Sequence, residues 1–311
     1  MTVKDKLQLI LITYNRKNNL KRTLDQLFEE NSPVKEYNLL IIDNNSNDGT
    51  EELIQNLMME HKNLQYKKNN YNIGLSGNIA MAILNTNMEY SWILADDDNY
   101  NFSHWEEVES AINNKEKLIC VARDYLPDKV KNDLAEQICQ FVFLPAGIWQ
   151  TSLINDTIMR NIFDNIYTIM PHLCIMVEAF NKKIPVRVID KGIVSYGREE
   201  ETDVSYSRGN SENELYPKIK HFKFIIGFIN ICMGLQDIKL RKKCIDKMIQ
   251  SPGQYKGYKH FYIQMVKLFC DDKEYGYWAD VLSQLYLKHQ IILIIKTIIK
   301  LIRNTLSFKK R

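Results

Sequence analysis

Three consecutive carboxylates, Asp96, Asp97 and Asp98, directly follow the apolar run from Tyr90 to Ala95. Such a run is typical of a buried strand, and open α/β sheets bind their ligands at the carboxyl ends of the strands. Adjacent acids repel one another, and the positive charge of a bound cation relieves this repulsion. Mn2+ and Mg2+ suit such a site because they prefer oxygen ligands. On an extended strand Asp96 and Asp98 point to the same side, so we expect these two to bind the metal. The alternative is an acidic turn that opens a helix, where acids are also favoured.

Polar segments follow two further apolar runs near the start of the chain. The run Leu7 to Thr13 leads into Tyr14 to Arg16, and the run Asn38 to Asp43 leads into the asparagine-rich stretch 44–49. The carboxyl ends of parallel strands lie along one edge of a sheet, so we expect these segments to meet the three acids there. A single Asp after a strand is more often a turn or cap residue, but three successive units favour one shared ligand.

The elements that must position these residues alternate between strand and helix. Helical periodicity separates the apolar runs, and an Asn- and Gly-rich loop at 69–78 precedes the run that ends in the acids. This alternation predicts an α/β fold with a mostly parallel, doubly wound sheet flanked by helices. The expected helices cover 19–30, 51–60, 79–84, 103–113, 151–161 and 171–182, and the later strands cover 64–68, 117–123 and 184–190. From residue 216 onward helical periodicity dominates, which predicts a helical C-terminal region.

Composition narrows the class of protein. With 311 residues, 45% of them apolar, the chain can bury a large core, and its net charge of +3 does not favour nucleic acid as a partner. Six cysteines are scattered without a CxxC pair or a zinc-type spacing, which predicts reduced thiols in a cytoplasm. No apolar signal-peptide segment precedes the first strand, so we expect a cytoplasmic protein.

Four short segments occur in order in the first third of the chain. They are Ile12-Thr13-Tyr14-Asn15-Arg16, Ile42-Asp43-Asn44-Asn45-Ser46-Asn47-Asp48-Gly49-Thr50, Asn72-Ile73-Gly74 with Asn78, and Leu94-Ala95-Asp96-Asp97-Asp98. As a set they resemble the motifs of the family 2 glycosyltransferases of the GT-A fold. The resemblance implies a metal-dependent, inverting transfer of a sugar from a nucleotide-diphosphate sugar, with a UDP-sugar favoured. It also implies a GT-A, Rossmann-like domain, which we place over residues 1–205, and the helical periodicity described above makes residues 206–311 the helical C-terminal region.

The resemblance assigns roles to the four segments. The loop Thr13 to Arg16 would line the base and ribose pocket, and Asp43 would accept a hydrogen bond from the base, which suits the N–H donor of uracil. Asp96 would lie near the ribose, and Asp98 would hold the metal that stabilises charge on the leaving diphosphate. The full set implied for nucleotide-sugar binding is Thr13, Tyr14, Asn15, Arg16, Asp43, Asn45, Asn72, Gly74, Asn78, Asp96, Asp97 and Arg198.

The expected catalytic base depends on a departure from the family pattern. Inverting members often carry a Glu-Asp pair near the start of a helix in the second half, and that pair is missing here. The corresponding stretch is 164–173, where His172 stands at the expected position and Asp164 is the next candidate. Histidine titrates near neutral pH without tuning, so we expect His172 to be the base. The alternatives are a structural histidine or an extra metal ligand.

Two later segments carry further expectations. The polar stretch 195–203 predicts a lid over the site with Arg198 as a phosphate clamp, and the alternative is a solvated linker. The C-terminal stretch 290–311 is rich in Ile and Leu, and Lys296, Lys300 and Arg303 lie on one helical stripe. It predicts a basic amphipathic helix that lies on an anionic membrane surface, or one that packs on protein.

The sequence therefore predicts a glycosyltransferase, peripheral to the inner face of a membrane, that acts on a hydroxyl of a glycan or lipid-linked glycan. Two other classes compete with it. A sugar-nucleotide pyrophosphorylase has a similar sheet but would carry a Gly-rich basic loop after the first strand, and Tyr14 to Asn18 contains no glycine. A non-catalytic nucleotide-sugar binding module is compatible with all four segments and would bind the donor without turnover.

Overall fold

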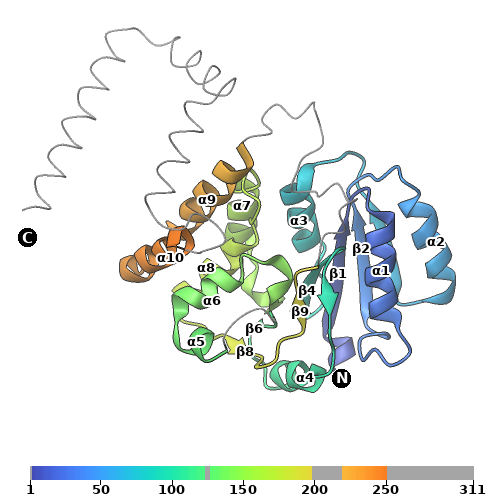
Figure 1. Ribbon diagram of the computed structural model, residues 1–311, viewed down its shortest axis with the longest axis horizontal. Coiled ribbons are helices and arrows are strands. Elements are labelled where there is room, and N and C mark those ends of the chain that lie inside the picture. Colours follow the sequence, from blue (N-terminus) through green and yellow to red (C-terminus); the bar gives the residue numbers. More distant parts are fainter. Residues whose placement is uncertain (1, 123–126, 198–218, 251–311) are drawn as a thin grey trace, which may run out of the picture.

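The computed structural model describes residues 2–122, 127–197 and 219–250 (Figure 1). Its main feature is a seven-stranded sheet with the order β3-β2-β1-β4-β7-β6-β8. Four neighbouring strands run parallel, namely β1 (Leu7–Thr13), β2 (Asn38–Asp43), β3 (Leu64–Lys68) and β4 (Tyr90–Ala95). The sheet continues through β7 (Gly147–Gln150), then β6 (Leu118–Cys120), then β8 (Arg187–Val188). β7 is antiparallel to both β4 and β6, and β8 is parallel to β6. The expected mostly parallel α/β sheet is confirmed.

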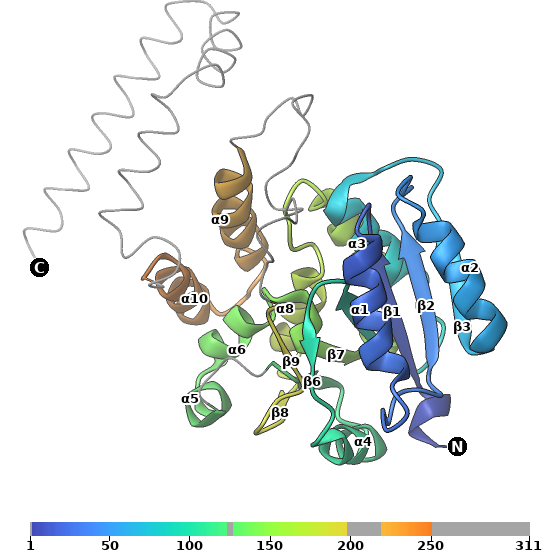
Figure 2. The same cartoon turned by 45° about the vertical axis from the view of Figure 1, so that its right-hand side comes forward.

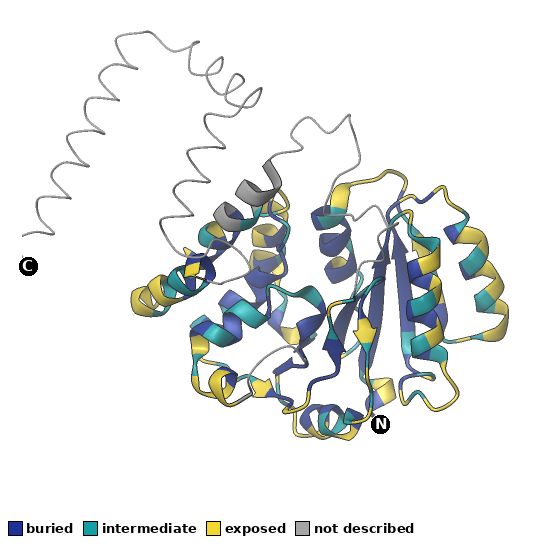
Figure 3. Ribbon diagram, in the orientation of Figure 1, coloured by how far each residue is buried: buried dark blue, intermediate teal, exposed yellow. Residues whose placement is uncertain are grey.

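Helices cover both faces of this sheet (Figure 2). Leu9 and Leu11 share a core with α1 (Lys17–Phe28), α2 (Thr50–Glu60) and α4 (Trp105–Asn113). Ile10 and Ile12 share the other core with α3 (Gly74–Leu84), α6 (Leu134–Gln140), α7 (Asp156–Asp164) and α8 (Leu173–Asn181). Successive residues of β1 point to opposite faces and both faces are buried, which is why the run is apolar without alternation (Figure 3).

Several element boundaries differ from the expected ones. α3 begins at Gly74 rather than at 79, and Asn72 Oδ1 accepts the Gly74 N–H at 2.9 Å in the turn just before the helix. α8 begins at Leu173, so Pro171 precedes the helix instead of occupying its first turn. β6 and β8 are shorter than the runs 117–123 and 184–190. The remaining short elements are η1 (Val3–Asp5), α5 (Pro127–Asn132), η2 (Leu144–Ala146) and η3 (Thr151–Leu153).

A two-stranded sheet was not expected from the sequence. β5 (Asn99–Tyr100) follows the acids directly and pairs antiparallel with β9 (Val194–Ser195). Each strand has two residues, too few for a hydrophobic pattern to mark them. The pairing nevertheless places residues 194–197 beside the acids, at the carboxyl ends of the strands of the large sheet.

The described part of the C-terminal region packs on the rest of the protein. α9 (Ile219–Cys232) and α10 (Ile238–Gln250) contribute buried apolar side chains to the core that contains α6 and α8. Lys247 of α10 also lies 3.0 Å from Asp133 and 2.6 Å from Glu136. Arg198 and the stretch 290–311 lie outside the described residues, and the domain division at 205 stays a prediction. In the described part of the chain, no helix combines the length and apolar character that a membrane span requires.

Candidate active site

The carboxyl ends of β1, β2 and β4 align at one edge of the sheet. Thr13 lies opposite Asp43 in the register of β1 and β2, and Ile12 lies opposite Ala95 in that of β1 and β4. The structure therefore brings the polar segments after these three strands together. The surroundings of the individual side chains differ from residue to residue, however.

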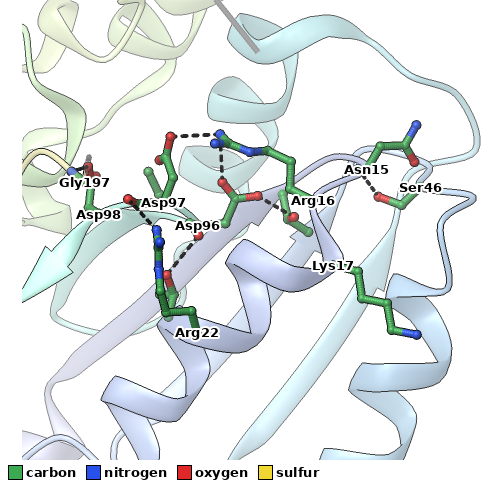
Figure 4. Close-up of polar contacts among 12 residues, drawn as sticks. Asn15, Arg16, Lys17, Arg22, Ser46, Asp96, Asp97, Asp98 and Gly197 are labelled. Carbon is green, nitrogen blue, oxygen red and sulfur yellow. Dashed lines mark hydrogen bonds and ion pairs between the residues drawn. The ribbon is translucent and has the colours of Figure 1, made fainter. Parts of the chain in front are cut away.

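The three acids occupy a turn and not a strand (Figure 4). β4 ends at Ala95, Asp96 and Asp97 form a turn, and Asp98 precedes β5; we name these three residues the acid turn. The side-chain alternation expected for an extended strand is therefore wrong. Asp96 and Asp98 are 4% and 3% exposed, whereas the Asp97 side chain is 37% exposed.

Asp96 is held by two residues at the end of β1. Thr13 Oγ1 donates to one carboxylate oxygen at 2.6 Å, and Arg16 Nη1 lies 3.3 Å from the other. The same Arg16 nitrogen donates to Asp97 Oδ2 at 2.9 Å, so one guanidinium bridges two acids. Burial raises the pKa of Asp96, and the positive charge of Arg16 opposes that shift. The chain itself thus supplies a cation for Asp96 and Asp97.

The polar side of α1 fixes the backbone of the acid turn. The backbone carbonyls of the acid turn accept hydrogen bonds from side chains of α1. The donors are Thr23 at 2.9 Å, Arg22 at 3.2 Å and Gln26 at 3.4 Å, for the first, second and third acid of the turn, respectively. These three residues were not expected in the site from the sequence. A signal for them existed, because positions 22, 23 and 26 adjoin on one side of a helix that follows β1.

Asp98 differs from the other acids because one of its oxygens lacks a donor. Oδ1 accepts the Gly197 N–H at 3.3 Å, but Oδ2 has no hydrogen-bond partner among the described residues. Burial, and then the neighbouring Asp97 charge, raises the pKa of Asp98 to about 8. A buried carboxylate without a donor is stabilised by a bound cation, and oxygen ligands suit Mn2+ or Mg2+. Asp98 therefore fits the expected metal.

The protein offers few further ligands for such a metal. Within the described ranges, no group of three or more His, Cys, Asp or Glu side chains could hold an ion. The second expected ligand, Asp96, already interacts with Thr13 and Arg16 through its two oxygens. A cation at Asp98 would therefore take most of its ligands from a bound phosphate group or from water.

Asp43 ends β2 but does not face a ligand. Its Oδ1 accepts from the backbone N–H and the hydroxyl of Ser46, and its Oδ2 accepts from the Tyr66 hydroxyl at 2.8 Å. The residue is fully buried, because the turn after β2 folds Ser46 back onto the carboxylate. The expectation that Asp43 accepts a hydrogen bond from a base is therefore not met in this structure. Asp43 instead shapes the turn that presents Asn45.

The loops after β1 and β2 form one surface. Asn15 and Asn45 have φ angles of 50° and 70°, a backbone region that asparagine tolerates better than most residues. The Asn15 N–H donates to Ser46 Oγ at 2.8 Å, and Asn15 Oδ1 accepts the Asn47 N–H at 2.8 Å. The exposed Asn15 and Asn45 and the half-buried Tyr14 thus lie on two linked loops.

A network of asparagines joins the loop after β2 to the start of α3. Asn44 Nδ2 donates to Asn72 Oδ1 at 2.7 Å, and Asn44 Oδ1 accepts from Asn69 at 3.2 Å. Asn78 is buried, accepts from Asn69 at 2.9 Å and donates to a carbonyl of β2 at 3.3 Å. The expected ligand contact of Asn78 is therefore corrected to a role in holding this loop. Asn72 and Gly74 are exposed, and their contact with a ligand stays a prediction.

His172 lies in the core and not at the carboxyl edge. It is 1% exposed, and its Nε2 lies 2.8 Å from the Phe141 carbonyl, to which the N–H donates. Burial lowers the pKa of His172 to about 4, so the ring is neutral at physiological pH. A base must come within hydrogen-bond reach of the acceptor hydroxyl, and a buried ring does not. The expectation that His172 is the base is not met.

Asp164 is the expected base candidate that is accessible. It is the last residue of α7 and is exposed. A few residues later, the Thr168 carbonyl accepts a hydrogen bond from Ser76 in the first turn of α3. This contact places the segment after Asp164 beside the helix that begins at Gly74.

Comparison with known proteins identifies related sequences. A family model described as Glycosyl transferase family 2 matches residues 8–184, a range that contains every strand end of the site. The abequosyltransferase RfbV of Salmonella typhimurium is 33% identical over 88 residues, which cover 28% of this chain and 26% of that protein. The GalNAc(5)-diNAcBac-PP-undecaprenol beta-1,3-glucosyltransferase of Campylobacter jejuni is 31% identical over 94 residues, 30% of each chain. The matched segments thus span less than a third of either relative.

Solved structures share the fold over most of the chain. The structure of S. aureus TarS 1–349 in complex with UDP-GlcNAc matches with a TM-score of 0.58 at 16% identity, covering 80% of this chain and 74% of that one. The mannosyltransferase PcManGT from Pyrobaculum calidifontis, in complex with GDP-Man and Mn2+, matches with a TM-score of 0.57 at 11% identity, covering 94% and 84%. The expected GT-A arrangement is confirmed.

Proposed function

The chain belongs to glycosyl transferase family 2, and from that premise we propose that it transfers a sugar from a nucleotide-diphosphate sugar to a hydroxyl group. The observation that carries this proposal is the acid turn at the carboxyl edge of a parallel sheet, in which a buried Asp98 oxygen has no hydrogen-bond partner among the described residues. Two proteins of similar fold support it, since their structures contain UDP-GlcNAc and GDP-Man.

The nucleotide belongs over the ends of β1 and β2 in this proposal. The exposed Asn15 and Asn45 and the half-buried Tyr14 form the loop surface there, and the diphosphate would lie between Arg16 and the start of α3. A helix N-terminus and a guanidinium both favour phosphate groups. A UDP-sugar stays the favoured donor, in line with the ligand of the TarS complex.

A divalent cation, Mn2+ or Mg2+, would be held by Asp98. When bound, it stabilises the negative charge that develops on the leaving diphosphate. Asp96 would act differently, because its oxygens orient Thr13 and Arg16 toward the same edge. The Mn2+ in the PcManGT complex supports a metal in this fold.

The acceptor side of the proposal concerns the base, the acceptor and the membrane. We assign inversion with Asp164 as base, because it is the accessible carboxylate of the segment in which the family places that group. The acceptor is a glycan or a lipid-linked glycan; the name of the C. jejuni relative includes a PP-undecaprenol acceptor. The basic stretch 290–311 would hold the enzyme at the inner, cytoplasmic face of a membrane.

A panel of donors tests this function. We expect UDP-GlcNAc, UDP-glucose or GDP-mannose to raise the melting temperature, and more so with Mn2+, because a ligand that binds the folded state stabilises it. The same donor should release its nucleoside diphosphate when incubated with the protein and Mn2+. Stabilisation without release would indicate a binding module. Formation of a nucleoside triphosphate from donor and pyrophosphate would indicate a pyrophosphorylase, and the absence of any shift or release would contradict the proposal.

A further inference from the structure

An exposed aromatic residue lies next to the acid turn and has no role in the donor site. Tyr196 is 61% exposed and precedes Gly197, whose N–H donates to Asp98. The Tyr196 ring packs on the ring of Phe143, with 4.0 Å between the ring centroids and 36° between the planes. Phe143 is half-buried. The two rings form an aromatic pair, and the residue after Tyr196 in the chain is the one that contacts the proposed metal ligand Asp98.

The fold explains why residues so distant in sequence meet there. β7 is antiparallel to β4, with Trp92 opposite Ile148, so the segment before β7 lies at the carboxyl end of β4. Phe143 belongs to that segment. Tyr196 follows β9, which pairs with β5 immediately after the acid turn, and its carbonyl accepts from Asn99 at 3.5 Å.

The aromatic pair is on the opposite side of the acid turn from the nucleotide loops. In the sheet order β2-β1-β4-β7, the loops proposed for the nucleotide follow β2 and β1, whereas the pair adjoins β4 and β7. A donor bound with its nucleotide over β1 and β2 and its diphosphate at Asp98 directs its sugar toward β7. The group that attacks this sugar must approach from the same side.

We propose that Tyr196 and Phe143 form the surface on which the acceptor saccharide stacks. The apolar C–H face of a pyranose packs against an aromatic ring, and a tyrosine also offers a hydroxyl to the sugar at its rim. The aromatic pair is anchored to the acid turn through Gly197, so a saccharide on it lies close to the transferred sugar. This inference rests on the proposed function, because it names the occupant of the acceptor side of that site.

Saturation-transfer NMR with simple pyranosides tests the surface directly. The probes are methyl β-D-glucopyranoside, methyl β-D-galactopyranoside and methyl N-acetyl-β-D-glucosaminide, each added to the full chain. We expect transfer to the ring protons of at least one probe, reduced by roughly fivefold in Tyr196→Ala and retained in Tyr196→Phe. Tyr196→Leu keeps an apolar side chain against Phe143 without a flat ring, and it should lose the signal as well.

A matched control comes from Tyr71, an exposed tyrosine in the loop between β3 and α3. Tyr71→Ala should leave the pyranoside signal unchanged, because it removes an exposed aromatic ring from a different loop. The inference is overturned if wild-type protein shows no saturation transfer to any pyranoside, or if Tyr196→Ala keeps the wild-type signal. It is also overturned if Tyr196→Leu keeps that signal, because the surface would then need only an apolar side chain, as a lipid chain does. Donor-induced melting shifts are measured on the same variants. If Tyr196→Ala loses the pyranoside signal but keeps the donor-induced melting shift, the acceptor surface is tested separately from donor binding. If wild-type protein shows no donor-induced shift, that result contradicts the donor-binding proposal and not the acceptor surface.

Discussion

Asp98 is the residue on which the proposed chemistry depends most. Asp98→Asn keeps an oxygen for the Gly197 N–H but removes the charge that holds a cation. We expect nucleotide release from the donor to fall by roughly two to three orders of magnitude. The melting temperature should be unchanged or higher, because the amide removes the cost of burying a carboxyl whose pKa is raised to about 8 and which must take up a proton on folding at neutral pH. Release assays with Mn2+ and thermal melts measure both effects.

The matched control for this substitution lies in the same turn. Asp97→Asn removes a carboxylate that is more exposed and already paired with Arg16, so its effect on turnover should stay below about tenfold. Near-wild-type turnover of Asp98→Asn in the presence of a chelator would show that Asp98 does not act through a metal.

Asp164 is the accessible candidate for the base. Asp164→Asn should lower transfer by roughly two orders of magnitude or more, because an amide does not take a proton from the acceptor. Donor-induced melting shifts should be unchanged, since donor binding does not need the base. Asp156→Asn at the other end of α7 is the control. Equal transfer by the two variants would remove Asp164 from the mechanism.

His172 affects stability and not turnover in our interpretation. Its pKa is about 4 in the folded protein against 6.5 in an unperturbed histidine, so the unfolded chain binds more protons between these values. The contribution of His172 to the free energy of unfolding should therefore fall as the pH falls from 6.5 toward 4, by about 1.4 kcal/mol per pH unit. Denaturant titrations at several pH values should show this contribution as the difference in slope between wild type and His172→Gln. His104→Gln, at a partly exposed position, should keep the wild-type slope, and an unchanged slope in His172→Gln would refute the assignment.

At the level of elements, β9 and residues 196–197 contact the acid turn, because β9 pairs with β5 directly after the turn and the Gly197 N–H donates to Asp98. A β-carbon on Gly197 would lie 1.6 Å from the Asp97 carbonyl oxygen, so only glycine fits this contact. Gly197→Ala should separate this segment from Asp98, destabilise the protein by about 1–3 kcal/mol and lower turnover by roughly tenfold or more. Thermal melts and release assays measure the two effects. Ser195→Ala, which leaves the backbone pairing of β9 with β5 intact, should change neither; wild-type behaviour of Gly197→Ala would mean that the contact is dispensable.

At the level of the whole molecule, the C-terminal region divides into two parts. α9 and α10 are packed into the core, whereas the basic stretch 290–311 is assigned to a membrane surface from its sequence alone. Deletion of residues 290–311 should release the protein from anionic vesicles without changing nucleotide release. High salt should weaken vesicle binding in part, because Ile and Leu burial adds to the charge interaction. A misfolded or aggregated deletion variant in sedimentation and melting assays would instead support packing of this stretch on protein.

The sequence by itself determined the fold class and the edge at which the site lies. The apolar runs of β1, β2 and β4 and the helices between them are local patterns, and parallel strands align their carboxyl ends whatever else the chain does. Thr13, Arg16 and the acid turn could therefore be expected to meet. The family resemblance, confirmed over residues 8–184, followed from the same segments.

Only the tertiary structure decided what each of these side chains does. Arg16 pairs with an acid 81 positions away, and Gly197 binds another 99 positions away, so neither contact follows from a local pattern. His172 has the residue type that the chemistry needs but is buried against Phe141 of another segment, and Asp43 is held by Ser46 of the following turn and by Tyr66 of β3. Burial and partners set the charge and reach of a side chain, and both arise when distant segments pack together.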